Sequence, residues 1–254
     1  MSEDAKFAGA LSTVLLGYVG WNILRELPFN YITQTEHPIC QFMNGSFCSR
    51  LSYAVAAFIV YTIASTTTGG QNALTAEKPI ATSIQGAGVG AALAISATVL
   101  NILFGFIHVK GFDASKITQL LPIVAGMALT GFTEEIMFRS LPIDLLGPYI
   151  GYDLMIWLAA LFFGYLHATY SLQYGVAAFL SGLLLGYGFL KYNIYWSIGL
   201  HSAFNTIETS FYTVADVTVK NGFMAGERKT PDDDGNTSSL LTLGFLGLQY
   251  INWI

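Results

Sequence analysis

Long apolar runs, separated by short polar stretches, recur along this chain, and most are close to the length of a membrane-spanning helix. Such a helix needs about 20 mainly apolar residues to cross the hydrocarbon core of a bilayer. The pattern predicts an all-α, polytopic transmembrane helical bundle, with about eight spanning helices in one domain over residues 1–254. The expected spans are 7–24, 51–65, 84–108, 117–146, 152–170, 172–190, 194–213 and 240–254.

The fourth of these runs, 117–146, is too long for a single straight crossing. As one helix it would measure about 45 Å, whereas the hydrocarbon core is about 30 Å thick. We therefore expect it to tilt or to break. Gly126 and Gly131 are the expected break points, because glycine weakens a helix interior.

Two runs carry small residues at every fourth position. Gly86, Gly90 and Ala94 follow this spacing in the third run, and Gly182 and Gly186 repeat it in the sixth. Small residues four apart let two helices approach closely in lipid. The pattern predicts close helix packing at both places.

The composition agrees with a multi-pass integral membrane protein. Hydrophobic residues make up 53% of the 254 residues and charged residues only 11%, which is too apolar for a soluble domain of this length. The formal net charge is −5, and no cluster of Lys and Arg is present to neutralise phosphates. The composition thus argues against nucleic-acid binding and leaves membrane lipid as an expected partner.

The first polar loop carries both cysteines, Cys40 and Cys48, around an N-glycosylation acceptor pattern at Asn44. A second acceptor pattern begins at Asn236. The two cysteines are predicted either to form one disulfide or to remain two free thiols, and the sequence leaves both alternatives open.

The segment from Thr133 to Arg139 places ionisable residues inside an apolar run. Ionisable groups at such depth are costly and usually mark function. Glu135 and Arg139 are four residues apart, so they can pair on one helix face, while Glu134 points elsewhere and remains free for chemistry. The alternative is an ordinary ion pair on a solvated helix, but the apolar surroundings disfavour it.

Two further polar sites interrupt later apolar runs. Phe163 and His167 lie four apart near the end of the fifth run, and His201 and Asn205 lie four apart in the seventh. This spacing places each pair on one helix face. Hydrogen bonds between helices are the alternative explanation.

Together the three motifs resemble the type II CAAX prenyl endopeptidase and bacteriocin-processing family of intramembrane proteases. The resemblance covers about 131–205, with the motifs in the family's order. It implies peptide-bond hydrolysis near the membrane surface, with a peptide or lipidated protein as substrate. The implied catalytic residues are Glu134 and His167, which activate water, and His201 and Asn205, which stabilise the oxyanion. Glu135, Arg139 and Phe163 are implied to support them.

The residue types fit that chemistry. A glutamate is a suitable general base, and the Asn amide and a His N–H are suitable oxyanion donors. Removal of a C-terminal tripeptide from prenylated CAAX proteins follows from the resemblance alone. No cofactor is expected. Zinc bound by Glu134, His167 and His201 stays open as an alternative, although no His-Glu-x-x-His helix is present.

A rival function uses the same residues. Buried Glu and His residues also form proton relays, so a proton-coupled transporter is one alternative, and a non-catalytic membrane scaffold is another. The order of the three motifs favours the protease. Substitution of Glu134 separates these possibilities, because a scaffold keeps its biological effect without that carboxylate.

Overall fold

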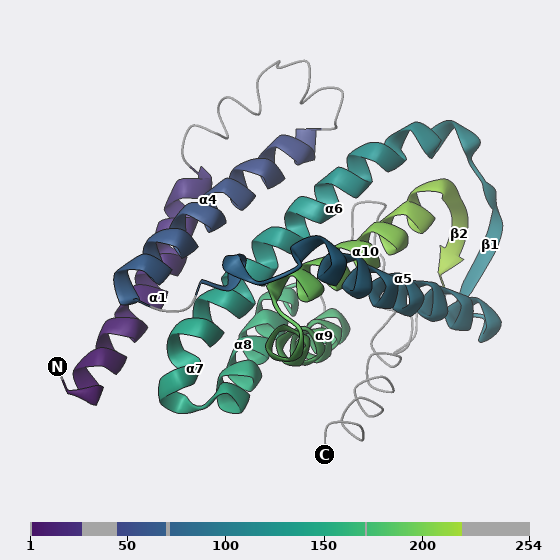
Figure 1. Ribbon diagram of the computed structural model, residues 1–254. Helices are drawn as coiled ribbons and strands as arrows, with labels where there is room; N and C mark the ends of the chain where they lie inside the picture. Colours follow the sequence, from purple (N-terminus) through teal and green to yellow (C-terminus); the bar gives the residue numbers. More distant parts are fainter. Residues whose placement is uncertain (1, 27–44, 70–71, 171, 220–254) are drawn as a thin grey trace.

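A computed structural model describes residues 2–26, 45–69, 72–170 and 172–219. Long helices dominate this part of the chain, with a pair of short strands at one end (Figure 1). The helices and strands are α1 (Glu3–Glu26), α4 (Gly45–Thr68), η1 (Ala73–Thr75), α5 (Pro79–Leu103), β1 (Ile107–Phe112), η2 (Ala114–Gln119), α6 (Leu120–Glu135), η3 (Ile136–Asp144), α7 (Leu145–Ile150), α8 (Tyr152–His167), α9 (Leu172–Lys191), α10 (Ile194–Val214) and β2 (Ala215–Val219).

Five helical segments of the described chain are long and apolar enough to cross a membrane, so the protein is a multi-pass membrane protein. The predicted number of eight is not confirmed. Helix α8 has only 16 residues, or about 24 Å of length, and is short for a crossing. Helix α10 is long enough but is not among the five, because its second half carries polar residues such as His201, Asn205 and Glu208. The predicted span 240–254 lies outside the described residues.

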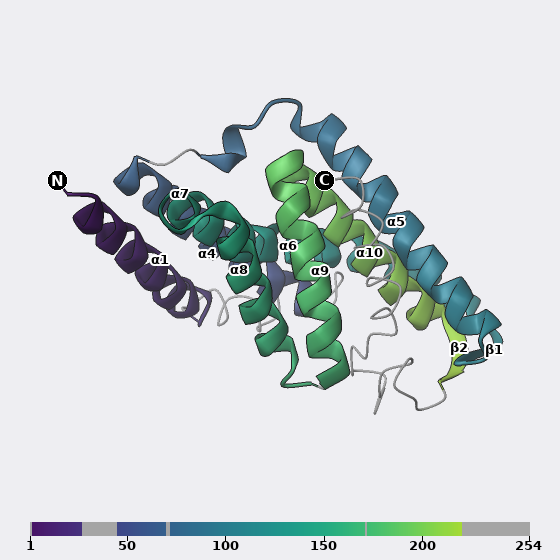
Figure 2. The same ribbon diagram turned by 90° about the horizontal axis from the view of Figure 1, so that it is seen from below.

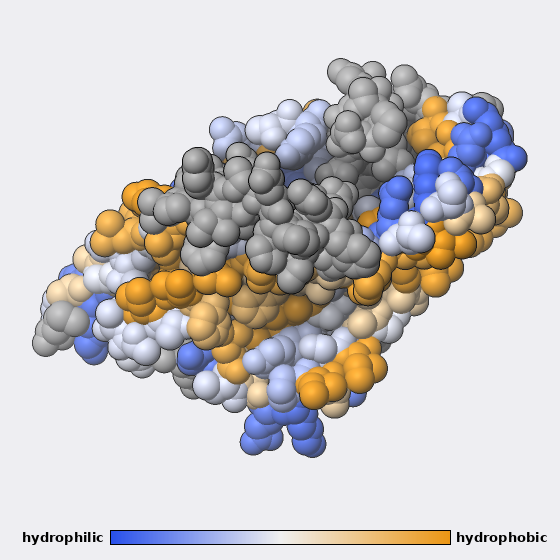
Figure 3. Space-filling model, turned by 90° about the horizontal axis from the view of Figure 1, so that it is seen from above, coloured by the Kyte–Doolittle hydropathy of each residue, from blue (hydrophilic) through white to orange (hydrophobic). Residues whose placement is uncertain are grey.

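The outer surface of the bundle is strongly apolar. Leu16 on α1 is 69% exposed, and Ile63 on α4, Ile84 on α5 and Leu161 on α8 are also exposed. Figure 3 shows a broad band of apolar residues across one face, with the most hydrophilic residues gathered at the edges of the view. A lipid environment solvates such a surface, whereas water does not.

Helices α5 and α10 form the most extensive helix pair, and they lie side by side in Figures 1 and 2. Gly86 and Gly90 pack directly against the backbone carbonyls of Trp196 and Leu200, and a Cβ at either glycine would overlap those atoms. Gly199 packs in the same way against the carbonyl of Ser83. The predicted close contact at this small-residue pattern is confirmed, and it brings the two backbones together as such patterns do in membranes.

The second small-residue pattern joins α8 to α9, which run side by side in Figure 2. Gly182 lies against Ala160, and Gly186 lies against Ile156. The prediction of close packing is confirmed here as well. As a result, the short helix α8 is held firmly along α9, and its last residue, His167, is placed at the end of that contact.

Two strands that the sequence analysis missed extend the α5–α10 pair. Strand β1 follows α5, strand β2 follows α10, and the two pair antiparallel from Ile107↔Val219 to Phe112↔Ala215. The predicted third span was therefore too long, since α5 ends at Leu103 and His108 lies in β1. Because α5 and α10 are packed together, the segments that leave them are already neighbours and can pair.

The predicted break of the fourth run at Gly126 or Gly131 was wrong. Helix α6 continues through both glycines, which instead allow close contacts with Arg50 of α4 and Ser202 of α10. The helix widens only after Glu135, into the π-helical segment η3. Pro142 lies inside η3 and lacks the N–H that an α-helix needs there, so a wider turn accommodates it.

Segment η3 runs through the centre of the protein core. The side chains of Ile136, Met137, Leu141 and Ile143 are completely buried in it. A π-helical turn is an uncommon structure that occurs frequently at functional sites. Here it begins directly after the two adjacent glutamates and contains Arg139.

Candidate functional site

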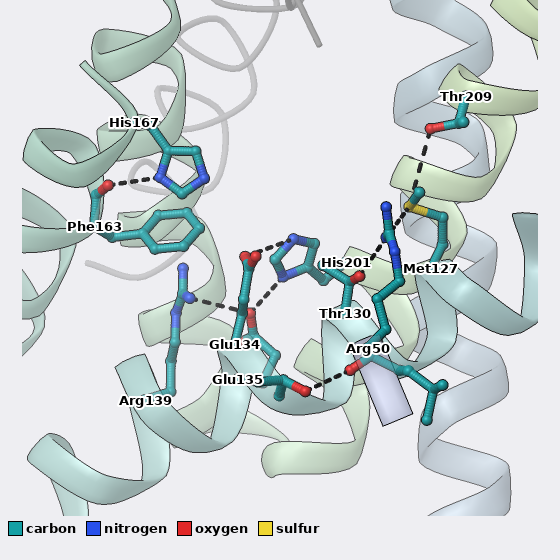
Figure 4. A network of polar contacts seen from close by, with 12 residues as sticks. Arg50, Met127, Thr130, Glu134, Glu135, Arg139, Phe163, His167, His201 and Thr209 are labelled. Atoms are coloured by element: carbon teal, nitrogen blue, oxygen red, sulfur yellow. Dashed lines mark hydrogen bonds and ion pairs between the residues drawn. The ribbon is translucent and has the colours of Figure 1, made fainter. Parts of the chain in front are cut away.

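Glu135 lies at the centre of a buried polar cluster. Its side chain has no exposed surface, and its Oε1 atom is 3.1 Å from Arg139 Nη1 and 2.7 Å from His201 Nδ1. The predicted Glu135–Arg139 ion pair is therefore present, on the last turn of α6 and the first of η3. The contact with His201 of α10 was not foreseen, and it ties these two parts of the fold together (Figure 4).

This contact fixes the role of each His201 ring nitrogen. Glu135 Oε1 also pairs with the Arg139 guanidinium, so we assign it as an accepting carboxylate and His201 Nδ1 as the donor. The Nε2 atom is then directed to the other side of the ring, where Glu134 Oε2 lies 3.5 Å away. A single histidine thus bridges the two adjacent acids.

Glu134 differs from Glu135 in its surroundings. Its side chain is 24% exposed and lines a cavity of about 410 Å³ that is bordered by α4, α5, α6, α8, α9 and α10. Three other predicted catalytic residues, His167, His201 and Asn205, line the same cavity. The structure therefore brings all four together around one space, although no hydrogen bond joins Glu134 to His167 directly in the described part of the chain.

His167 closes α8 at the edge of this cavity. Its Nδ1 lies 2.8 Å from the carbonyl oxygen of Phe163. Because a carbonyl only accepts hydrogen bonds, Nδ1 is assigned as the donor and Nε2 as the acceptor of a neutral ring. Figure 4 shows this second nitrogen on the side of the ring that faces Glu134 and His201. It can accept a hydrogen bond from a water in the cavity.

The contacts of the Phe163 ring account for the presence of this residue in the motif. The Arg139 guanidinium lies 4.5 Å from the ring centroid, the His167 ring is centred 4.3 Å away, and the His201 ring meets it edge-on at 6.3 Å. The aromatic ring thus lies between Arg139 and His167. It gives the buried guanidinium a cation–π contact and fixes the orientation of the imidazole.

Several cavity residues were missed by the sequence analysis. Glu208 lines the cavity three residues after Asn205 and seven after His201, so the same helix periodicity could have revealed it. Arg50 enters from α4 and donates to Thr130 Oγ1 on α6 over 2.6 Å. Nothing in the sequence indicated that Arg50 reaches this site, since it directly precedes the predicted span 51–65.

The donor set does not form a metal site in this conformation. Across the described ranges, no three His, Cys, Asp or Glu side chains are grouped so that they could hold a metal ion. The alternative set of Glu134, His167 and His201 lines the cavity but is not grouped in this way. Cys48 is disulfide-bonded, so the alternative of two free thiols is not borne out. Asn44 and Asn236 lie outside the described residues, so the predictions on glycosylation remain predictions.

Comparison with known families agrees with the motifs. Residues 116–207 match the model of the type II CAAX prenyl endopeptidase Rce1-like family, and this region contains η3, α6, α8, α9 and the part of α10 that carries His201 and Asn205. No curated protein and no solved structure matches the chain. The match confirms the resemblance drawn from the three motifs. This part of the chain is therefore similar to a family of membrane-embedded CAAX-type proteases.

Proposed function

We propose that the protein is an intramembrane endopeptidase in which Glu134 and His167 activate a water molecule. The observation that carries the proposal is the shared cavity: Glu134, His167, His201 and Asn205 come from three helices and line one cavity. The family match over 116–207 supports hydrolysis of a peptide or a prenylated protein. The whole chain, 1–254, is proposed to form one domain around this site.

The first chemical step is attack of water on the scissile carbonyl carbon. Glu134 accepts one water proton as general base, while the water is held by His167 Nε2. The carbonyl oxygen then becomes an oxyanion in a tetrahedral intermediate. When this intermediate collapses, the C–N bond breaks, and the proton held by Glu134 passes to the leaving nitrogen. The products are a new carboxylate and a new amine.

The oxyanion requires hydrogen-bond donors that are already in place. Asn205 offers its amide N–H, and His201 offers Nε2–H if the ring is an imidazolium, because Nδ1 already donates to Glu135. The charges of the cluster support this state. Two carboxylates, the Arg139 guanidinium and the His201 imidazolium sum to zero, so no net charge is buried. Glu135 thus acts as a positioning residue for His201.

The decisive experiment measures hydrolysis by purified protein in lipid vesicles. The substrates are a farnesylated CAAX peptide, the same peptide without the lipid, and unrelated membrane-proximal peptides. We expect Glu134→Gln and His167→Gln each to reduce turnover by about 10²–10⁴-fold, the contribution typical of general acid–base catalysis. Glu77→Gln is the matched control, because Glu77 is exposed and does not line the cavity.

Loss of hydrolysis counts as support only if the variants remain folded, so their thermal unfolding is measured in parallel. If well-folded wild-type protein hydrolyses no peptide, the protease proposal fails and the scaffold or transporter becomes the better hypothesis. Metal analysis of dialysed, active protein tests the mechanism separately. Stoichiometric zinc whose removal stops turnover and whose return restores it would reassign Glu134, His167 and His201 as ligands.

A further inference from the structure

Arg50 is a cavity residue that the proposed hydrolysis does not use. Its stem passes Gly126 of α6, where an added Cβ would lie 3.4 Å from Arg50 Cδ. Its Nη1 donates to Thr130 Oγ1 over 2.6 Å and lies 3.6 Å from Met127 Sδ (Figure 4). Gly126, Met127 and Thr130 of α6 therefore contact Arg50 and hold its guanidinium at the cavity.

The guanidinium has no anionic partner in the described part of the chain. Glu134 and Glu208 line the same cavity, but neither forms an ion pair with Arg50. It is also the only Lys or Arg among the described residues lining the cavity. A charged side chain that is partly buried in a membrane-spanning helix is costly unless it is paired. A guanidinium with donors left over is suited to bind a carboxylate or a phosphate in a bidentate manner.

The position of Arg50 relative to the proposed nucleophilic water indicates which anion. Its partner Thr130 precedes Glu134 by one turn of α6, about 6 Å along the helix, and both side chains line the cavity. An extended peptide advances about 3.3–3.6 Å per residue. A free carboxylate one to three residues beyond the scissile bond therefore ends within roughly 3–11 Å of it, a range that includes the one-turn separation between Glu134 and the Thr130 partner of Arg50.

We propose that Arg50 binds the C-terminal α-carboxylate of the substrate and thereby restricts cleavage to bonds close to a free C-terminus. The proposal rests on the proposed protease function and adds a specificity residue to it. The anion chemistry is shared with the phosphate of a lipid headgroup, so the experiment has to distinguish these two sources.

The test compares two peptides of identical sequence, one ending in a free carboxylate and one in a carboxamide. For wild-type protein we expect kcat/KM to favour the free acid by about 10- to 100-fold, as for a hydrogen bond between charged groups. In Arg50→Gln this acid-to-amide ratio falls close to one, and in Arg50→Lys an intermediate ratio remains. Lys116→Gln, which removes an exposed cation outside the cavity, keeps the wild-type ratio.

The ratio is measured within one protein sample, so partial misfolding of a variant does not affect it. A wild-type ratio near one, or an unchanged ratio in Arg50→Gln, overturns the proposal while the protease function stands. The assay is repeated in phosphatidylcholine vesicles with and without phosphatidylglycerol. An Arg50→Gln effect that is equal for both peptides and needs the anionic lipid assigns the site to lipid phosphate and also overturns the proposal.

If wild-type protein cleaves neither peptide, the protease function is what has failed. Arg50 is then tested by binding alone, using fluorescence anisotropy of the same two labelled peptides. Tighter binding of the acid than of the amide, lost in Arg50→Gln but not in Lys116→Gln, still supports the carboxylate site. Equal binding of the two peptides contradicts it.

Discussion

The two halves of α10 have opposite environments. The first half, 194–200, is almost entirely buried, and its carbonyl groups at Trp196 and Leu200 lie directly on glycines of α5. From Ser202 to Val214 every residue is only partly buried, and several side chains face the cavity. His201 stands at the boundary, buried but in contact with both adjacent acids.

This difference shows how one helix can border an open cavity and still hold a site residue such as His201 in a fixed position. Backbone-to-backbone contact with α5 leaves the first half little freedom to move. The second half extends from this anchor, is partly buried throughout, and presents Asn205 and Glu208 to the cavity. Substitutions in the anchor should therefore act mainly on stability, and substitutions in the cavity should act mainly on activity.

The largest expected effect on stability is at Glu135 of α6, which contacts His201 at the boundary between the two halves of α10. Replacing Glu135 with Gln leaves the Arg139 guanidinium buried without its counter-charge, and breaking such a pair typically costs about 3–5 kcal/mol. Thermal unfolding in detergent measures this loss. The matched variant is Glu134→Gln, which removes a partly exposed carboxylate and should unfold close to wild type. Equal unfolding temperatures for the two variants would contradict this assignment.

The next largest effect is expected at Asn205, in the cavity half. Asn205→Ala removes one proposed oxyanion donor, and loss of such a donor typically lowers kcat by about 10²–10³-fold. We expect no change in unfolding temperature, because Asn205 is only partly buried. Asn22→Ala, on an exposed position of α1, is the matched amide control and should keep full turnover. A purely structural role of Asn205 would instead lower stability and activity together.

Two glycines of α5 test its contact with the first half of α10, 194–200, which we call the anchor half. A Cβ at Gly90 would overlap the Leu200 carbonyl, whereas a Cβ at Gly88 would meet nothing within 4 Å. We expect Gly90→Ala to lower stability by about 1–3 kcal/mol, the usual cost of overpacking, and to displace His201 one residue away. Gly88→Ala should be neutral or stabilising by up to about 1 kcal/mol, because Ala favours the helix. Similar stability of both variants would show that α5 and α10 can separate freely.

The sequence predicted more of the packing than of the geometry. Regular spacing revealed both small-residue contacts and the Glu135–Arg139 pair, because these depend on helix periodicity alone. The break at Gly126 or Gly131 was wrong, because a glycine that allows close packing and one that weakens a helix look identical in a sequence. The π-helical turn depends on how Pro142 is accommodated in a packed core, which no local pattern expresses.

The candidate site shows the same limit. Helix periodicity predicted that His201 and Asn205 share one helix face. The order of the motifs in the resembled family predicted that Glu134 and His167 belong to the same site. The contact of His201 with both acids could not be predicted, since it depends on the position of α10 along α6 in the packed bundle. Arg50 was missed for a related reason. Its guanidinium reaches the cavity across another helix, so only the tertiary structure places it there.

The smallest expected difference compares one hydroxyl from each half of α10. Ser197 is completely buried, and its Oγ donates to the Leu185 carbonyl of α9 over 3.0 Å. Ser197→Ala should lower stability by about 1 kcal/mol, the net value of a typical buried hydrogen bond. Thr209 Oγ1 is partly buried and lies 4.0 Å from Met127 Sδ, which is too long for a hydrogen bond that contributes much. Thr209→Ala should therefore stay within about 0.5 kcal/mol of wild type. Chemical unfolding of the two variants side by side measures this difference in stability. A larger loss of stability for Thr209→Ala than for Ser197→Ala would mean that the second half of α10, not the first, contributes most to the stability of this helix.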